Sequence, residues 1–96
     1  MTDLGLQRLK EVVTYIETHP EEWDQTHWCG TACCLAGHAQ RMAGRKQNTW
    51  GCPRDAENWL QLSYIERRWL FSAKRTLADF HAFIAARGIP EDVPNE

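Results

Sequence analysis

The chain has 96 residues and a formal net charge of −2, and 25% of its residues are charged. This length supports one domain with one modest core, and the composition is that of an ordinary globular protein, which argues against general disorder. No apolar run approaches the roughly 20 residues of a membrane helix, and the N-terminus MTDLGLQRLK has no apolar signal region. We therefore expect a cytoplasmic protein whose four cysteines are thiols or ligands rather than disulfides.

Helical periodicity dominates the first half of the chain. An amphipathic helix is predicted from about Asp3 to Thr18, and Pro20 ends it because proline disfavours a helical residue before it. Pro20 then suits the first position of a short helix over residues 20–25. The next helix is predicted from Thr31, a good N-cap, to Gly44, a good C′ residue.

The second half continues the helical pattern after a polar loop over residues 45–52. A helix from Pro53 to about Gln61 is predicted, and its inward residues are Ala56, Trp59 and Leu60. Ser63 and Glu66 have the spacing of a capping box. The helix that they open has Ile65, Trp69 and Leu70 on its apolar side. A last helix starts at Ser72 or Thr76, presents Leu77, Phe80 and Ile84, and closes at Gly88 and Pro90.

No segment alternates apolar and polar residues over a strand's length. The prediction is therefore an all-α fold, a compact single-domain bundle of four to six short helices over residues 1–88. Residues 89–96 are predicted to form a mobile acidic tail.

The stretch 28–42, WCGTACCLAGHAQRM, concentrates cysteines and small residues. Four alanines fall on one helical stripe flanked by Leu35 and Met42; they are Ala32, Ala36, Ala39 and Ala43. Such a stripe lets another helix backbone approach closely. Cys34 and His38, four residues apart, would lie together on a more polar flank.

This cysteine cluster allows a zinc site as an alternative reading. Cys29, Cys34 and His38 would be ligands, and Cys33, Cys52 or His27 could complete the tetrahedral set. Zinc would then be the cofactor; otherwise we expect none. No CxxC pair is present and the spacing is weakly specific, so buried packing cysteines are the favoured interpretation.

Thiol chemistry is the second alternative for the same cluster. Cys29 precedes the predicted helix, where unpaired N–H groups favour a thiolate. His27 or His38 could act as its base, but no orienting Asn or Asp is evident.

The loop around Trp50 is the predicted binding surface. Trp50 is the tryptophan most expected to be exposed, and Arg45 and Lys46 lie near it. An aromatic side chain beside basic ones is typical of protein contacts and of single-stranded nucleic-acid contacts. Residues 31–88 carry nine bases and four acids, but the acidic ends weaken a nucleic-acid reading.

Residues 29–39, CGTACCLAGHA, resemble the C-G-T-x-x-C-x-A-G-x-A segment of small uncharacterised proteins from phages and bacteria. The resemblance extends loosely over residues 28–71, through Leu60–Leu62, Ser63–Glu66 and Leu70-Phe71. Cys29 and Cys34 match the pattern, whereas Cys33 and Cys52 do not. The resemblance implies a shared helical fold and brings no activity.

The function expected from the sequence is that of a non-enzymatic interaction module. It would dock on a macromolecular partner, most simply a protein, as a phage-type inhibitor or accessory factor. The alternative is a small zinc-stabilised or thiol-active domain that uses Cys29, Cys34 and His38.

Overall fold

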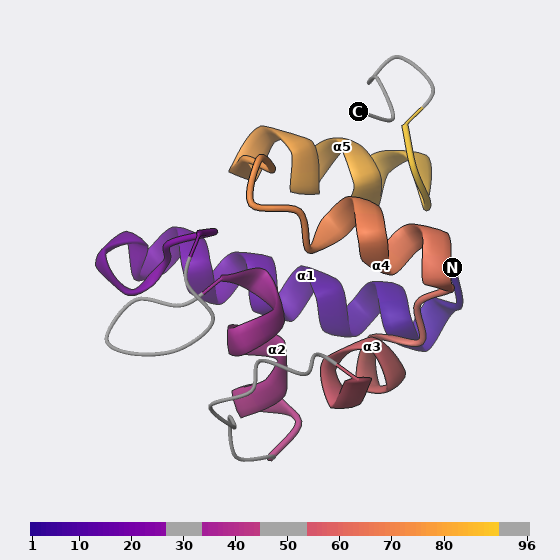
Figure 1. Cartoon of the computed structure of the whole chain (residues 1–96), viewed down its shortest axis with the longest axis horizontal. Coiled ribbons are helices and arrows are strands. Elements are labelled where there is room, and N and C mark those ends of the chain that lie inside the picture. The colour runs from indigo at the N-terminus through magenta and orange to yellow at the C-terminus, as the bar shows by residue number, and fades with distance from the viewer. Residues whose placement is uncertain (27–33, 45–53, 91–96) are drawn as a thin grey trace.

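The computed structural model describes residues 1–26, 34–44 and 54–90. These residues form five α-helices and one 3-10 helix and contain no extended strand, which confirms the predicted all-α class. The elements are α1 (Asp3–Thr18), η1 (Pro20–Glu22), α2 (Leu35–Met42), α3 (Arg54–Leu60), α4 (Tyr64–Leu70) and α5 (Leu77–Ala86). Figure 1 shows α1 in the middle, with α2 and α3 on one side of it and α4 and α5 on the other. None of the helices within the described ranges has both the length and the apolar character that crossing a membrane requires.

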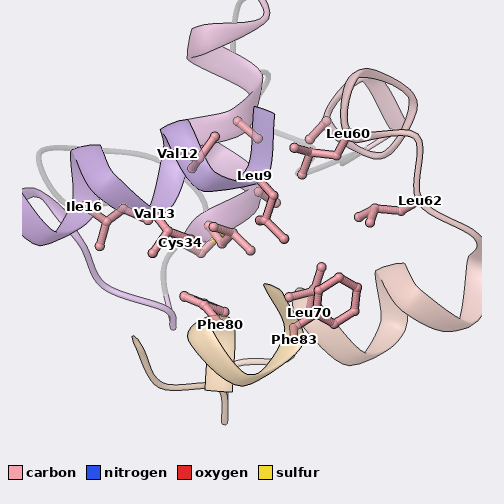
Figure 2. Close-up of a cluster of buried hydrophobic side chains, with 14 of the residues drawn as sticks. Leu9, Val12, Val13, Ile16, Cys34, Leu60, Leu62, Leu70, Phe80 and Phe83 are labelled. Atoms are coloured by element: carbon pink, nitrogen blue, oxygen red, sulfur yellow. The ribbon is translucent and has the colours of Figure 1, made fainter. Parts of the chain in front are cut away.

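The core forms around the apolar face of α1. Leu9, Val12 and Ile16 are fully buried there, and the helix begins at Asp3 because the Thr2 hydroxyl accepts a hydrogen bond from the Gly5 N–H at 3.0 Å. Figure 2 shows these side chains meeting residues from the rest of the fold, including Cys34, Leu60, Leu62, Leu70, Phe80 and Phe83. The 3.6-residue apolar pattern of the first helix therefore organises the whole fold.

The short helix predicted over residues 20–25 is wrong beyond its first turn. Only Pro20–Glu22 are helical, and Trp23 is extended with φ −114° and ψ 127°. Trp23 leaves the helix because its ring packs edge-on against Phe80, with centroids 6.1 Å apart. Its indole N–H also donates to the Gln25 side-chain oxygen at 3.1 Å.

Helix α2 begins later than its local signals predict. It starts at Leu35 with Cys34 as N-cap, whereas Thr31 was expected to cap it; Thr31 itself lies outside the described residues. The Gln25 side-chain oxygen accepts a hydrogen bond from the Leu35 N–H at 2.9 Å. This contact from ten residues upstream satisfies one of the orphan donors at the start of the helix.

The alanine stripe is confirmed in part. Ala36 is 2% exposed and Ala39 is fully buried, and Gly44, with φ +77°, ends the helix as predicted. Met42, which was predicted to flank the stripe, is 40% exposed. The reason is that α2 is buried all round only as far as Gln40, and its last turn emerges from the domain.

A second close approach of backbones, between α1 and α3, was not predicted. A Cβ atom added to Gly5 would lie 2.2 Å from the Leu60 carbonyl oxygen. Only glycine lets the two helices meet at this distance. Nearby, the Arg8 guanidinium donates to the Trp59 carbonyl at 2.7 Å and lies over the Trp59 ring.

The capping boxes of α4 and α5 fix the second half of the fold. The Ser63–Glu66 box is present as predicted, and a matching box of Thr76 and Asp79 selects Thr76 over Ser72 as the start of α5. Ile65 is 65% exposed, so its predicted inward position is wrong. The capping box fixes the first turn of α4 in place of a buried Ile65 side chain. The Glu66 carboxylate also forms an ion pair with the Met1 amine, with Oε2 and the amine nitrogen 3.8 Å apart.

The end of α5 differs from the prediction by one residue. Arg87, with φ +58°, takes the left-handed position that Gly88 was expected to fill. Hydrogen bonds from the Gly88 N–H to Phe83 and from the Arg87 N–H to Ile84 form a Schellman ending. Ile89 packs against the core and Pro90 is buried, so the packed chain extends past the predicted boundary at residue 88. Residues 91–96 of the predicted tail lie outside the described residues.

Candidate functional site

Most of the predicted site residues lie outside the described part of the chain. They are the binding residues Arg45, Lys46 and Trp50, and the alternative ligands His27, Cys29, Cys33 and Cys52. Cys34 and His38 are described. The predictions for the loop around Trp50 therefore stay predictions.

The expected side-by-side placement of Cys34 and His38 on a helical face is wrong. Cys34 precedes the helix with an extended backbone, φ −72° and ψ 175°, and is 8% exposed within the core cluster. His38 is 2% exposed, and its Nε2–H donates to the Glu22 carbonyl at 2.7 Å. Any metal would have to use the other ring nitrogen of His38. Among residues 1–26, 34–44 and 54–90, no three His, Cys, Asp or Glu side chains come together as a metal site.

A small pocket lies where the last turn of α2 meets α1, and we call it the α1–α2 pocket. It has a volume of about 190 Å³ and is lined by Tyr15, His38, Arg41 and Met42. Tyr15 stands at the edge of the buried face of α1, and Arg41 and Met42 stand on the exposed end of α2. Its walls therefore combine an aromatic ring, a flexible thioether and a guanidinium.

Hydrogen bonds to Glu22 of η1 hold two walls of this pocket, Tyr15 and His38, in place. The Tyr15 hydroxyl donates to the Glu22 carboxylate at 2.8 Å, and His38 binds the Glu22 backbone carbonyl. The Tyr15 ring also stacks on His19, with centroids 4.1 Å apart and an interplanar angle of 14°. Glu22 thus fixes the positions of Tyr15 and His38, which come from two different helices.

The electrostatics of the pocket keep both rings neutral. Burial lowers the pKa of His38, and the hydrogen bond that His38 donates to the Glu22 carbonyl only partly opposes that effect. The hydrogen bond to the Glu22 carboxylate raises the pKa of Tyr15. A tyrosine with a raised pKa is a weaker acid, so Tyr15 keeps its proton more firmly than a free tyrosine does.

The buried His38 predicts a pH dependence of folding. Because its pKa is lowered in the folded state, the unfolded chain binds more protons below the ordinary histidine pKa, and stability falls as the pH falls. We expect the free energy of unfolding to drop more between pH 7 and pH 5 for the natural chain than for His38→Gln. Glutamine keeps a donor for Glu22 but does not titrate in this range. Urea unfolding of both proteins at the two pH values measures the difference, and parallel losses would show that His38 is not the titrating group.

Tyr15, Arg41 and Met42 were not predicted as site residues. Their sequence positions contain no signal of a pocket, because the pocket arises from the long-range packing of α1 against α2. The available hint was weak: Tyr15 is the aromatic residue at the margin of an otherwise aliphatic stripe.

The chain matches no protein-family model, no curated protein and no solved structure. The resemblance of residues 29–39 to phage and bacterial proteins therefore stays a prediction.

Proposed function

We propose that this chain is a protein-interaction domain, and that the α1–α2 pocket receives one apolar side chain of a partner protein. The size of the pocket supports this. At about 190 Å³ it is smaller than the roughly 300 Å³ at which pockets for whole small-molecule ligands begin. A single leucine, methionine or aromatic side chain is an occupant of suitable size.

The lining residues support a protein partner in particular. Tyrosine, arginine and methionine are the residue types enriched at protein interfaces, and all three line this pocket. Met42 is 40% exposed, so a partner can reach its side chain. Its unbranched thioether can adapt its shape to an inserted side chain.

The observation that carries the proposal is the pairing of an exposed Met42 with a pocket in which two of the other walls, Tyr15 and His38, are already fixed. Tyr15 and His38 are held through Glu22, so little side-chain entropy is lost when a partner binds. Zinc or thiol function depends on Cys29 and its neighbours, which lie outside the described residues, and no observation favours it here.

Replacing Met42 with glutamate tests the proposal. A charge at the pocket's rim should weaken binding of a partner captured by the natural chain by at least about tenfold, or about 1.4 kcal/mol. The matched control is Ile65→Glu, because Ile65 is a more exposed apolar residue that does not line this pocket. Surface plasmon resonance with the captured partner compares the two variants.

Both variants should fold, because each changes an exposed position, and circular dichroism checks this. If Met42→Glu binds the partner as well as Ile65→Glu does, the pocket is not the docking site. If neither natural nor variant protein retains any protein partner, the interaction function itself is wrong.

A further inference from the structure

A second pocket lies between the end of α2 and helix α3, and we call it the α2–α3 pocket. It has a volume of about 270 Å³ and is lined by Ala43, Asp55, Asn58 and Trp59. Ala43 follows Met42 directly in the chain. A partner that covers the end of α2 would therefore meet both pockets.

The α2–α3 pocket is polar, and a carboxylate defines its charge. Asp55 is exposed, and its described hydrogen bond is the one that Oδ2 accepts from the Gln40 side-chain amide at 3.1 Å. Asn58 adds a side-chain amide to the same wall. The pocket therefore suits a ligand that is positively charged and rich in hydrogen-bond donors.

Gln40 lies behind Asp55, on the buried side of this carboxylate. It is only 1% exposed, and its Oε1 is buried without a hydrogen-bond partner. Since a carboxylate can only accept, the nitrogen of the Gln40 amide must face Asp55, and the unsatisfied atom is the carbonyl oxygen. The hydrogen bond to Asp55 therefore satisfies only the amide nitrogen of Gln40, and it fixes the Asp55 carboxylate from behind.

Trp59 does not provide the attraction for a cation. The Arg8 guanidinium already lies 5.0 Å from the centre of the Trp59 ring and donates to the Trp59 carbonyl. We therefore assign the attraction to Asp55, with Gln40 directly behind it.

We propose that the α2–α3 pocket binds the guanidinium of an arginine side chain, supplied by the same partner whose apolar side chain enters the α1–α2 pocket. This inference rests on the proposed function. Arginine fits better than lysine because its planar fork forms two parallel hydrogen bonds with a carboxylate. Its five N–H groups leave donors for the Asn58 side-chain oxygen after Asp55 is bound.

The test uses N-acetyl-arginine amide as the probe, titrated into the ¹⁵N-labelled full chain and followed by NMR. We expect saturable shifts of the Ala43, Asp55 and Asn58 amides and of the Trp59 indole N–H. The neutral isostere N-acetyl-citrulline amide should give none at the same concentration. Asp55→Asn should weaken the arginine probe at least tenfold, whereas the control Glu11→Gln, an exposed acid on α1, should not. Equal shifts with citrulline, or unchanged affinity in Asp55→Asn, would overturn the proposal.

The two proposals fail separately. Met42→Glu should leave binding of the arginine probe intact, because Met42 does not line the α2–α3 pocket. With the captured partner, Asp55→Asn should weaken binding at least tenfold. If Asp55→Asn has no effect on the partner while Met42→Glu abolishes binding, the arginine inference is wrong and the proposed function stands. If the probe binds as expected but Met42→Glu leaves partner binding unchanged, the α1–α2 pocket is wrong as the docking site.

Discussion

Gln25→Ala is expected to lower the free energy of unfolding by about 2–4 kcal/mol. Gln25 is 7% exposed, and its side chain joins three parts of the fold. Its oxygen accepts from the Leu35 N–H, and its nitrogen donates to the Leu70 and Ser72 carbonyls at 3.1 and 2.9 Å. Truncation leaves these backbone groups without partners, and each buried unsatisfied group costs about 1–3 kcal/mol.

Urea unfolding measures this effect, and Gln7→Ala is the matched control. Gln7 lies on the exposed side of α1, so its loss should change stability by less than about 0.5 kcal/mol. A Gln25→Ala protein as stable as Gln7→Ala would mean that water replaces the missing side chain. The link from α2 to the α4–α5 connection would then not stabilise the fold.

Gly5→Ala should destabilise the chain by about 1–3 kcal/mol or more, although alanine is the better helix former. In an open helix this change gains about 0.5–1 kcal/mol. Here the new methyl group would lie 2.2 Å from the Leu60 carbonyl oxygen, which belongs to the backbone and cannot rotate away. The two helices must separate, and overpacking of this kind costs more than the helix propensity returns.

Gly88→Ala is the control for Gly5→Ala, because the nearest atom to its added Cβ is a flexible Glu66 oxygen at 3.9 Å. Thermal unfolding of the two variants compares them directly. A melting temperature of Gly5→Ala at or above that of the natural chain would show that α1 and α3 do not approach as closely as described.

The parts of the fold that depend on local chemistry could be predicted from the sequence. The bounds of α1 follow from its periodicity and from Pro20, and the start of α4 follows from its Ser63–Glu66 capping box. These signals act within a few residues, where the energies of capping and of proline are strong.

The parts that depend on distant contacts could not be predicted. The start of α2 depends on Gln25, and the contact at Gly5 depends on Leu60, far along the chain. Arg75 shows the same limit. Lys74-Arg75 is a basic pair of the kind that usually lies on a solvated helix face. Arg75 is nevertheless only 8% exposed, and its Nε donates a hydrogen bond to the Trp69 carbonyl at 2.8 Å.

The candidate site was still harder to predict. The α1–α2 pocket joins Tyr15 to Arg41 and Met42, and the α2–α3 pocket joins Ala43 to Asp55 and Asn58. Neither set has a motif spacing, because the packing of whole helices creates both pockets. The composition of the cysteine-rich stretch allowed a metal or thiol site, but its described cysteine, Cys34, is part of the core.

Site-specific photo-crosslinking from the end of α2 tests the central claim most directly. A photoreactive phenylalanine analogue replaces Met42 in one protein and Ile65 in another, and each is irradiated in an extract of the organism that encodes the chain. We predict that position 42 crosslinks to one discrete protein, that position 65 does not, and that adding Asp55→Asn reduces the yield at position 42. The absence of a crosslink at position 42, or the same product from both positions, would contradict a docking site at the end of α2.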